Sequence, residues 1–452
     1  MPHMLEWSQA FAGRLEESAV EPFRQRAPEL AARLRKEVAE GLLPFLSMPY
    51  RSQLEKDLAA LEPELRHFRH MLLLGIGGSA LGARALQKAF APAQDGPAHE
   101  GPSLWIADNV CAATLESWLD RLEPAETVVV CISKSGGTIE TLSQYFLVRD
   151  WLRGTLGEDW AAHMLFVTDA AKGFLREEAD REQIRALEVP DNLGGRYSAL
   201  SAVGLVPAVF LGMDWRGLLR GAAAVARPLA HAATDADMCA ALEAHPAFAL
   251  AAWARALEAR GYSELIFFCY MPQWATFGPW FAQLWAESLG KQGKGMMPLS
   301  ATGVTDQHSV NQMFLDGPRN KACLFVSCGN LPQGRVFPAD IPEKWSYLRG
   351  RHFGVLLDAE AIGTRMALVQ SQVPLVSLMP AAADEEAAGA MMLLLEAATV
   401  LTGWLLDINP IDQPAVELGK RLANARLGAS GYAEEQRELS AFLGIPPRVQ
   451  AY

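Results

Sequence analysis

Short runs of consecutive apolar residues recur along the chain, and polar or glycine-rich turns separate them. Continuous runs, unlike runs in which polar and apolar residues alternate, are typical of parallel strands that are buried on both faces of a sheet. The pattern therefore predicts buried strands at residues 71–74, 127–132, 164–168, 265–270 and 323–327.

Amphipathic segments of helical length lie between these strands, for example residues 80–89, 139–153 and 277–288. Repeated strand–helix–strand units are typical of a doubly wound α/β fold with parallel sheets. The polar and alanine-rich stretch 220–245 has no strand signal and separates two such series. We expect N-terminal helices and a first α/β domain in residues 1–230, a second α/β domain in 231–385 and a helical segment in 386–452 that packs on both domains.

The most apolar stretch, residues 387–406, carries Glu396 at its middle and follows three acidic residues, Asp384, Glu385 and Glu386. A charge at the centre of a membrane span is costly, so we expect a buried core helix and no membrane association. The N-terminal residues include Glu6, Arg14 and Glu16, where a signal peptide would need an unbroken apolar segment.

Charge and composition narrow the class of protein further. The 452 residues include forty Lys and Arg and fifty-two Asp and Glu, which gives a net charge of −12. An acidic balance of this kind argues against nucleic acid as a partner. Six cysteines lie scattered without a CxxC pair, and nine histidines show no zinc-ligand spacing. We expect a cytoplasmic protein with reduced thiols, no metal and no cofactor.

A glycine-rich turn follows the first predicted strand. Gly75, Gly77, Gly78 and Ser79 lead into a helix, so backbone N–H groups and a helix N-terminus converge on one point that favours an anion. A dinucleotide is one candidate ligand, but Ala80 replaces the third glycine of GxGxxG, and a tight turn without a ligand is the other alternative.

A second turn follows the strand at 127–132. It combines hydroxyls, a lysine and two glycines in SKSGGT and so suits a phosphate monoester, with Ser133, Lys134, Ser135 and Thr138 as candidate contacts. A helix cap would explain Thr138 or Ser135 alone. If the two strands are neighbours, both turns lie at the carboxyl edge of one sheet, which favours a phosphorylated small molecule.

Candidate acid, base and cationic residues lie further along the chain. Glu287 occupies an otherwise apolar helix with Gln283 four residues earlier on the same face, so it is either a general base or a glutamate paired with Lys291. Arg196 follows two glycines, His308 lies in a polar loop and Lys420 lies near Glu417. Each of these three, taken alone, is more typical of a solvated surface residue.

Taken together, six motifs in one order resemble the glucose-6-phosphate isomerase family of the compact bacterial type. They are GIGGS, SKSGGT, GGRYS, QLWAES with a following GK, TDQHS and IDQPAVELGK. The resemblance implies two sugar-isomerase-type three-layer α/β/α sandwich domains, C-terminal helices and a homodimer that binds a phosphorylated hexose. It also implies reversible isomerisation of glucose 6-phosphate and fructose 6-phosphate by ring opening and a cis-enediol intermediate, without metal or nucleotide.

The resemblance also assigns roles to residues. Glu287 resembles the base that moves a proton between C2 and C1, and Arg196 the cation that stabilises the enediolate. His308, supplied by the partner subunit, and Lys420 resemble the pair that opens the sugar ring. The matching substrate contacts are Gly78, Ser79, Ser133, Lys134, Ser135, Thr138 and Gln283.

Some positions depart from the family pattern. Gly137 stands where threonine is common, Leu289 where asparagine is usual and Ala415 where glycine is familiar. One phosphate-binding hydroxyl is therefore in question, whereas the acid and base residues are intact.

Three alternatives to this function remain. A dual phosphoglucose and phosphomannose isomerase is disfavoured by Gln283 and by the complete GGRYS motif. A non-catalytic sugar-phosphate-binding regulator would not need Glu287, His308 and Lys420 together. A dehydrogenase would bind NAD, which we do not expect here.

Overall fold

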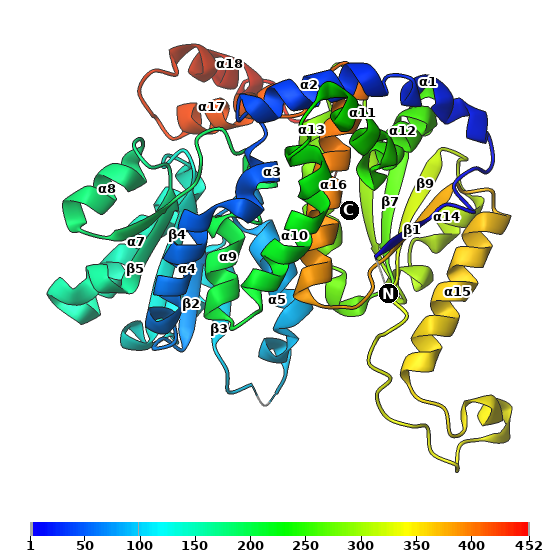
Figure 1. Ribbon diagram of the computed structural model, residues 1–452. Helices are drawn as coiled ribbons and strands as arrows, with labels where there is room; N and C mark the ends of the chain where they lie inside the picture. The colour runs from blue at the N-terminus through cyan, green and yellow to red at the C-terminus, as the bar shows by residue number, and fades with distance from the viewer. Residues whose placement is uncertain (1–2, 98, 451–452) are drawn as a thin grey trace. The chain divides into compact units, whose positions relative to one another are not determined.

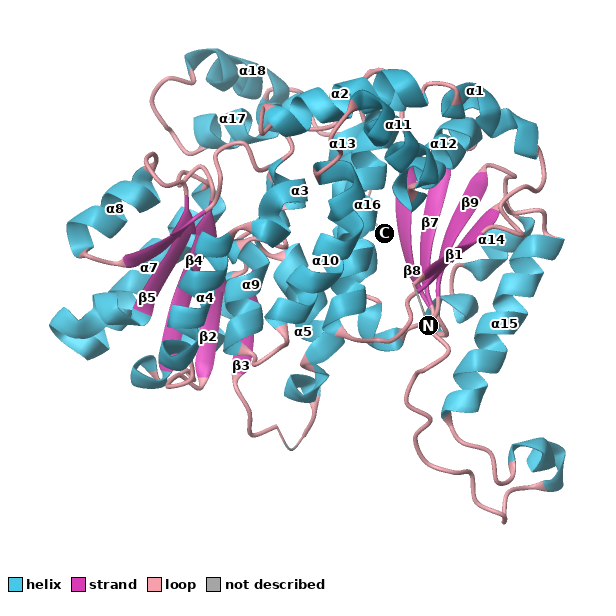
Figure 2. Ribbon diagram, in the orientation of Figure 1, coloured by secondary structure: helices cyan, strands magenta, loops and turns pink. Residues whose placement is uncertain are grey.

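The computed structural model describes residues 3–97 and 99–450 (Figure 1). Packing divides the chain into two compact units, of which the first ends at Pro410 and the second begins at Ile411. The first unit contains two β-sheets with helices packed against them, and the second is helical over its described residues, 411–450 (Figure 2).

The first sheet has the strand order β3-β2-β4-β5-β6, and all its pairs are parallel. Its strands are β2 (His70–Leu74), β3 (Ser103–Ala107), β4 (Thr127–Ser133), β5 (Met164–Thr168) and β6 (Arg185–Glu188). The strands predicted at 71–74, 127–132 and 164–168 are confirmed. The helices of this region are α4 (Ser52–Leu65), α5 (Leu81–Phe90), α6 (Ala112–Leu119), α7 (Ile139–Leu156), α8 (Phe174–Glu182) and α9 (Ala202–Phe210).

The second sheet has the order β1-β10-β9-β7-β8. Its parallel strands are β7 (Glu264–Cys269), β8 (Met297–Thr302), β9 (Lys321–Val326) and β10 (Leu375–Met379), and its connecting helices are α13 (Phe277–Leu289), α14 (Asn311–Asp316) and α15 (Gly354–Gln370). The strands predicted at 265–270 and 323–327 are confirmed, as is the helix at 277–288. The α/β class with parallel sheets predicted from the apolar runs is therefore correct.

Five of the observed strands were not predicted: β3 and β6 of the first sheet, and β1, β8 and β10 of the second. β1 (Met4–Glu6) pairs antiparallel with β10, with Leu5 opposite Leu378. A three-residue strand gives too short a pattern to recognise, and its partner lies in a distant part of the sequence. Residues 4–6 therefore form an edge strand of the sheet whose other strands come from the second half of the chain.

Helices join the two sheets within the first unit. They are α1 (Glu21–Arg24), α2 (Ala27–Ala39), α3 (Pro44–Ser47), α10 (Trp215–Ala230), α11 (Asp235–Ala244), α12 (Pro246–Ala259) and α16 (Glu385–Leu405). In the described part of the chain, α16 alone is long and apolar enough to cross a membrane, and 94% of its most apolar window is buried. It packs against α10, α12 and α13, as expected of a core helix.

The second unit contains α17 (Glu417–Arg426) and α18 (Ala433–Leu443), which pack on each other. The domain boundaries predicted at residues 230 and 385 fall at the end of α10 and at the start of α16. They stay predictions.

Candidate active site

The two glycine-rich turns begin at the same edge of the first sheet. β2 and β4 are parallel neighbours, with Leu74 opposite Cys131, so the turns that follow them both leave the carboxyl edge. The expectation that the two strands are neighbours is therefore confirmed. Such an edge is where open α/β sheets bind ligands.

The first turn makes unusually close backbone contacts. It forms a short helical turn, η3 (Gly77–Ser79), and a Cβ on Gly78 would lie 2.3 Å from the carbonyl oxygen of Gly195. Gly77 has φ +56°, and a Cβ there would lie 2.9 Å from Nε2 of Gln283. Only glycine lets this turn approach both the GGRYS segment and helix α13.

The second turn holds its hydroxyls together. Oγ of Ser133 lies 3.0 Å from Oγ1 of Thr138, and Nζ of Lys134 donates to the carbonyl of Asp191 at 2.9 Å. Ser135 is exposed. A Cβ on Gly137 would meet no other atom closer than 3.9 Å, so the departure at this position leaves space that a threonine side chain could fill.

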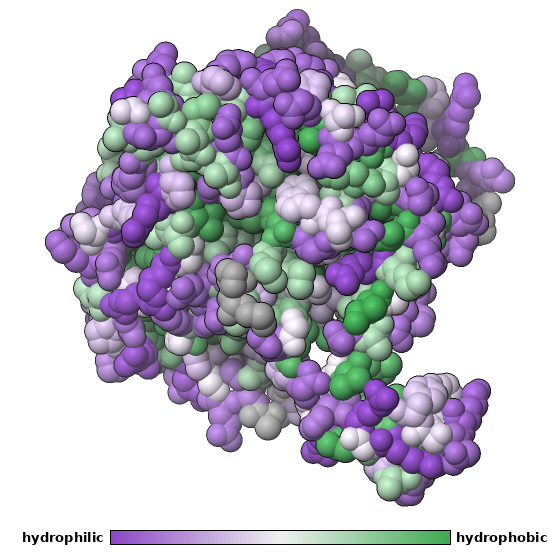
Figure 3. All heavy atoms as spheres, turned by 45° about the vertical axis from the view of Figure 1, so that its right-hand side comes forward, coloured by the Kyte–Doolittle hydropathy of each residue, from purple (hydrophilic) through white to green (hydrophobic). Residues whose placement is uncertain are grey.

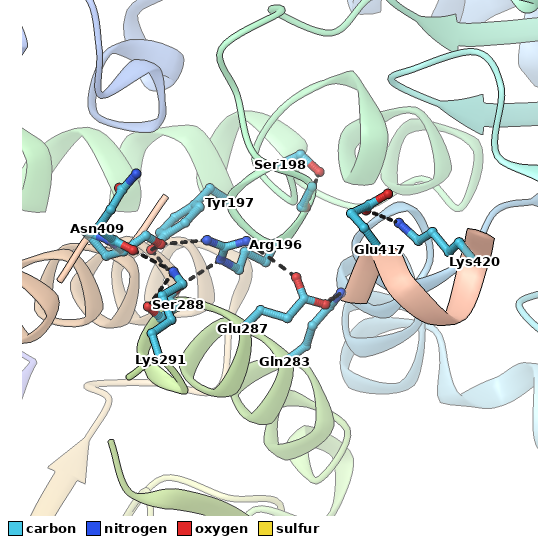
Figure 4. A network of polar contacts seen from close by, with 12 residues as sticks. Arg196, Tyr197, Ser198, Gln283, Glu287, Ser288, Lys291, Asn409, Glu417 and Lys420 are labelled. Carbon is cyan, nitrogen blue, oxygen red and sulfur yellow. Dashed lines mark hydrogen bonds and ion pairs between the residues drawn. The ribbon is translucent and has the colours of Figure 1, made fainter. Parts of the chain in front are cut away.

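Arg196 is buried at the meeting point of these elements (Figure 4). It lies in η7 (Gly195–Tyr197) and is 2% exposed, so its interpretation as a solvated surface charge is wrong. Nη1 lies 3.4 Å from Oε2 of Glu287, and Nε and Nη2 donate at 2.6 Å to Oγ of Ser288 and to the carbonyl of Pro410. Local sequence cannot reveal this burial, because the bond to Pro410 spans 214 positions.

Glu287 lies in the last turns of α13 and accepts two hydrogen bonds. Nε2 of Gln283 donates to its Oε1 at 2.9 Å, while Arg196 contacts its Oε2. Lys291, the alternative partner, donates to the carbonyls of Ser288 and Asn409. The side chain of Glu287 is 31% exposed. The carboxylate is thus fixed on one side by an amide and a guanidinium and is open to solvent on the other.

Two neighbours of these residues escaped the sequence analysis. The hydroxyl of Tyr197 lies 2.9 Å from Oγ of Ser288, and both side chains are buried. Burial raises the pKa of the Tyr197 phenol above its usual value. One sequence signal could have found them. Tyr197 directly follows Arg196 in the GGRYS motif, and Ser288 directly follows Glu287 in the QLWAES motif.

His308 lies far from Glu287 within its own chain. It ends η9 (Thr305–His308), directly after the carboxyl end of β8, whereas α13 returns Glu287 to the amino end of that strand. β8 has six residues and so spans roughly 20 Å at about 3.3 Å per residue. The sequence analysis treated both as site residues, and one chain alone does not bring them together.

The neighbours of His308 turn inward while its own imidazole is exposed. Asp306 accepts from the backbone of Thr302 at 2.7 Å, and Gln307 bonds Tyr270, Thr364 and Glu360. Among residues 3–97 and 99–450, no hydrogen bond or ion pair involves the imidazole of His308. The hydrogen bonds of Asp306 and Gln307 therefore hold the segment from which the solvent-exposed His308 projects.

Lys420 lies on α17 of the second unit. Its Nζ contacts Oε1 of Glu417 at 2.8 Å, and both side chains are more than half exposed. Among the described residues, no group of three or more His, Cys, Asp or Glu side chains has the geometry of a metal site.

Known proteins resemble the chain closely. A family model described as phosphoglucose isomerase matches residues 64–333. A glucose-6-phosphate isomerase of Rubrobacter xylanophilus is 38% identical over 418 residues, covering 89% of this chain and 94% of that protein. One of Carboxydothermus hydrogenoformans is 33% identical over 444 residues, covering 94% of each.

Solved structures agree with these relatives. A hypothetical protein from Thermus thermophilus superposes with a TM-score of 0.82 at 31% identity, covering 94% of this chain and all of that one. A glucose-6-phosphate isomerase from Chlamydia trachomatis superposes with a TM-score of 0.76 over 98% of this chain and 92% of its own. At 19% identity, the latter likeness supports the fold.

Proposed function

This chain belongs to the phosphoglucose isomerase family, and from that premise we propose how its residues carry out the reaction. The enzyme is an aldose–ketose isomerase that interconverts glucose 6-phosphate and fructose 6-phosphate. The observation that carries our assignment of roles is the pairing of a buried Arg196 with a partly exposed Glu287 beside two glycine turns.

Glu287 acts as the base that transfers a proton between C2 and C1. As its carboxylate takes the proton and becomes neutral, negative charge develops on the enediolate oxygen of the sugar. Arg196 lies 3.4 Å from the carboxylate and stays charged throughout the reaction. Without moving, it can therefore interact first with the Glu287 carboxylate and then with the enediolate oxygen. A preorganised cation of this kind is worth a few kcal/mol, roughly 10²–10³-fold in rate.

The glycine turns hold the phosphate of the substrate. The hydroxyls of Ser79, Ser133, Ser135 and Thr138, the amide of Gly78 and the ammonium of Lys134 are its proposed contacts. Because the phosphate is remote from C1 and C2, its binding energy serves to orient the open-chain sugar against Glu287. Gln283 keeps the Glu287 carboxylate facing this space through its 2.9 Å bond.

His308 and Lys420 open and close the sugar ring, and the active enzyme is a homodimer. The roughly 20 Å length of β8 separates His308 from Glu287 in one chain, which favours a histidine supplied by the partner. Val310 and Met313, two and five residues after His308, are exposed, as are Trp345, Tyr347 and Phe353. The last three belong to the segment before α15, which projects below that helix in Figure 1 and is seen at the lower right of Figure 3. Large exposed apolar side chains of this kind favour a protein–protein interface at this end of the sheet.

We further propose a cytoplasmic enzyme that needs no metal. All six cysteines are free thiols, which suits a reducing compartment. The rival dual phosphoglucose and phosphomannose isomerase is disfavoured by Gln283, which bonds the proposed base, and a non-catalytic regulator is disfavoured by family membership.

A coupled assay in the presence of a chelator tests this proposal. Purified protein should convert fructose 6-phosphate to glucose 6-phosphate at full rate with the chelator present, and should turn over mannose 6-phosphate far more slowly. Turnover only with added metal, or comparable rates on both sugars, would contradict the mechanism or the specificity respectively.

A further inference from the structure

We propose that Ser288 and Tyr197 are positioning residues that lock the Arg196 guanidinium in place between Glu287 and the carbonyl of Pro410. This inference rests on the proposed function, because it explains how the cation of that site is held. The two hydroxyls and the Pro410 carbonyl are called the arginine clamp below.

The guanidinium is held by neutral groups more tightly than by the carboxylate. Its two bonds to the clamp, from Nε to Ser288 and from Nη2 to Pro410, are each 2.6 Å, whereas the contact from Nη1 to Glu287 is 3.4 Å. We therefore expect its position to depend little on the charge of Glu287. When Glu287 takes up the substrate proton, Arg196 keeps its place and remains directed at the reacting carbons.

The hydrogen bonds of the clamp form one chain, in which each group donates to the next and every donor has an acceptor. Because Nε of Arg196 donates to Ser288, the Ser288 hydroxyl is left to donate to Tyr197 at 2.9 Å, and the Tyr197 hydroxyl to the Pro410 carbonyl at 3.4 Å. Because burial raises the pKa of the Tyr197 phenol, this hydroxyl keeps the proton that it donates to Pro410. Its ring stacks on Phe45 with centroids 5.2 Å apart, which fixes the hydroxyl in position.

Burial makes the clamp necessary. Arg196 and Ser288 are 2% and 0% exposed, so water cannot replace a lost bond to the guanidinium. A buried donor without an acceptor is costly, and a flexible side chain relieved of its partner adopts other rotamers. Loss of the clamp should therefore move the cation away from the developing charge.

The residues that precede the second unit are held by Lys291 and by the residues bound to the Pro410 carbonyl. Nζ of Lys291 donates to the carbonyl of Asn409 at 2.5 Å, and Arg196 and Tyr197 hold that of Pro410. The unit that begins at Ile411 carries Lys420. The arginine that serves proton transfer thus also anchors the chain segment leading to a proposed ring-opening residue.

Steady-state kinetics on the full-length enzyme test the clamp. We expect Ser288→Ala to lower kcat for fructose 6-phosphate about 10–100-fold and to change KM less than about twofold, because Ser288 lies outside the phosphate turns. Tyr197→Phe should lower kcat about 3–10-fold, and the double variant should lose less than the product of the two, since both act through Arg196. Ser288→Thr keeps a hydroxyl and should recover most of the activity.

Ser201→Ala is the matched control. Ser201 is an equally buried serine, but it caps helix α9 through the backbone of Val203, so its loss should lower thermal stability without lowering kcat. Should Ser288→Ala fail to fold, Tyr197→Phe and Ser288→Thr carry the test.

Two failures can be told apart. A wild-type enzyme that turns over fructose 6-phosphate while Ser288→Ala and Tyr197→Phe retain its kcat within twofold would overturn the clamp alone. A wild-type protein without turnover would overturn the proposed function and the clamp with it.

Discussion

The proposed proton-transfer centre and the proposed ring-opening residues are built in opposite ways. Arg196 and Glu287 are joined to each other and to Gln283, Ser288 and Pro410, and the guanidinium is buried. His308 and Lys420 are exposed residues on η9 and α17, and neither belongs to a comparable network within its own unit, as far as residues 3–97 and 99–450 show. The residues proposed for proton transfer are thus preorganised inside one chain, whereas those proposed for ring opening face solvent.

The difference follows from what each step requires. Moving a proton between two carbons needs a base and a cation fixed to within a fraction of an ångström, which buried networks provide. Opening a ring needs groups that can approach a sugar after it has bound. Assembly of subunits is one way to bring an exposed histidine to a finished site.

Glu287→Gln should have the largest effect, because it removes the proposed base of the preorganised site. The amide cannot accept a proton, so we expect kcat to fall about 10³-fold or more. Exchange of the C2 hydrogen with solvent, followed by NMR in D₂O, should be lost, while a sugar-phosphate inhibitor binds nearly as before.

The control for this variant is Glu116→Gln on α6, which removes an exposed carboxylate elsewhere on the first unit. Persistent C2 exchange in Glu287→Gln would move the base role to another residue.

Arg196→Lys should have the next largest effect. A lysine keeps the positive charge but cannot contact Glu287, Ser288 and Pro410 at once, so we expect kcat to fall about 10²-fold with a smaller change in KM. Arg185→Lys, on an exposed ion pair with Glu64, is the matched control. Wild-type kcat in Arg196→Lys would show that charge without a fixed position is sufficient.

Glu396 sharpens the contrast, because it is a buried carboxyl that lacks the partners of Glu287. It is fully buried in α16, neither of its carboxyl oxygens has a hydrogen-bond partner among the described residues, and burial raises its pKa well above the usual range. The folded state therefore binds this proton more tightly than the unfolded chain does. Its contribution to stability is full below the unfolded-state pKa of about 4.3 and is lost as pH rises toward the folded-state pKa.

Glu396→Met should remove this pH-dependent loss. We expect a melting temperature about 2–5 °C above wild type at about pH 8, with a smaller gain at about pH 5. Thermal unfolding followed by circular dichroism at the two pH values measures both. Equal melting temperatures for the two proteins at the higher pH would mean that Glu396 carries no desolvation cost.

Much of the fold follows from local sequence. The five strands predicted from continuous apolar runs are all present, because a strand covered on both faces must be apolar throughout, whereas β1, β3, β6, β8 and β10 were not predicted. β1 was missed, since three residues carry no periodicity and its partner is remote. Edges of sheets depend on tertiary pairing, which single-sequence patterns do not contain.

The site divides in the same manner. The glycine turns were recognisable because their spacing is local, and the close approach of Gly78 to Gly195 gives the physical reason for glycine there. The burial of Arg196 and the proposed roles of Ser288 and Tyr197 were not recognisable, because they rest on contacts between residues some 91 to 214 positions apart.

The most direct test of a site divided between chains is a subunit-mixing experiment. Glu287→Gln and His308→Ala subunits, each inactive alone, are unfolded together and refolded. If His308 acts across the interface, half of the dimers are mixed and each regains one intact site, so activity should return to about one quarter of the wild-type value. No recovery from a mixture that forms dimers would contradict the account, because both residues would then have to act within one chain.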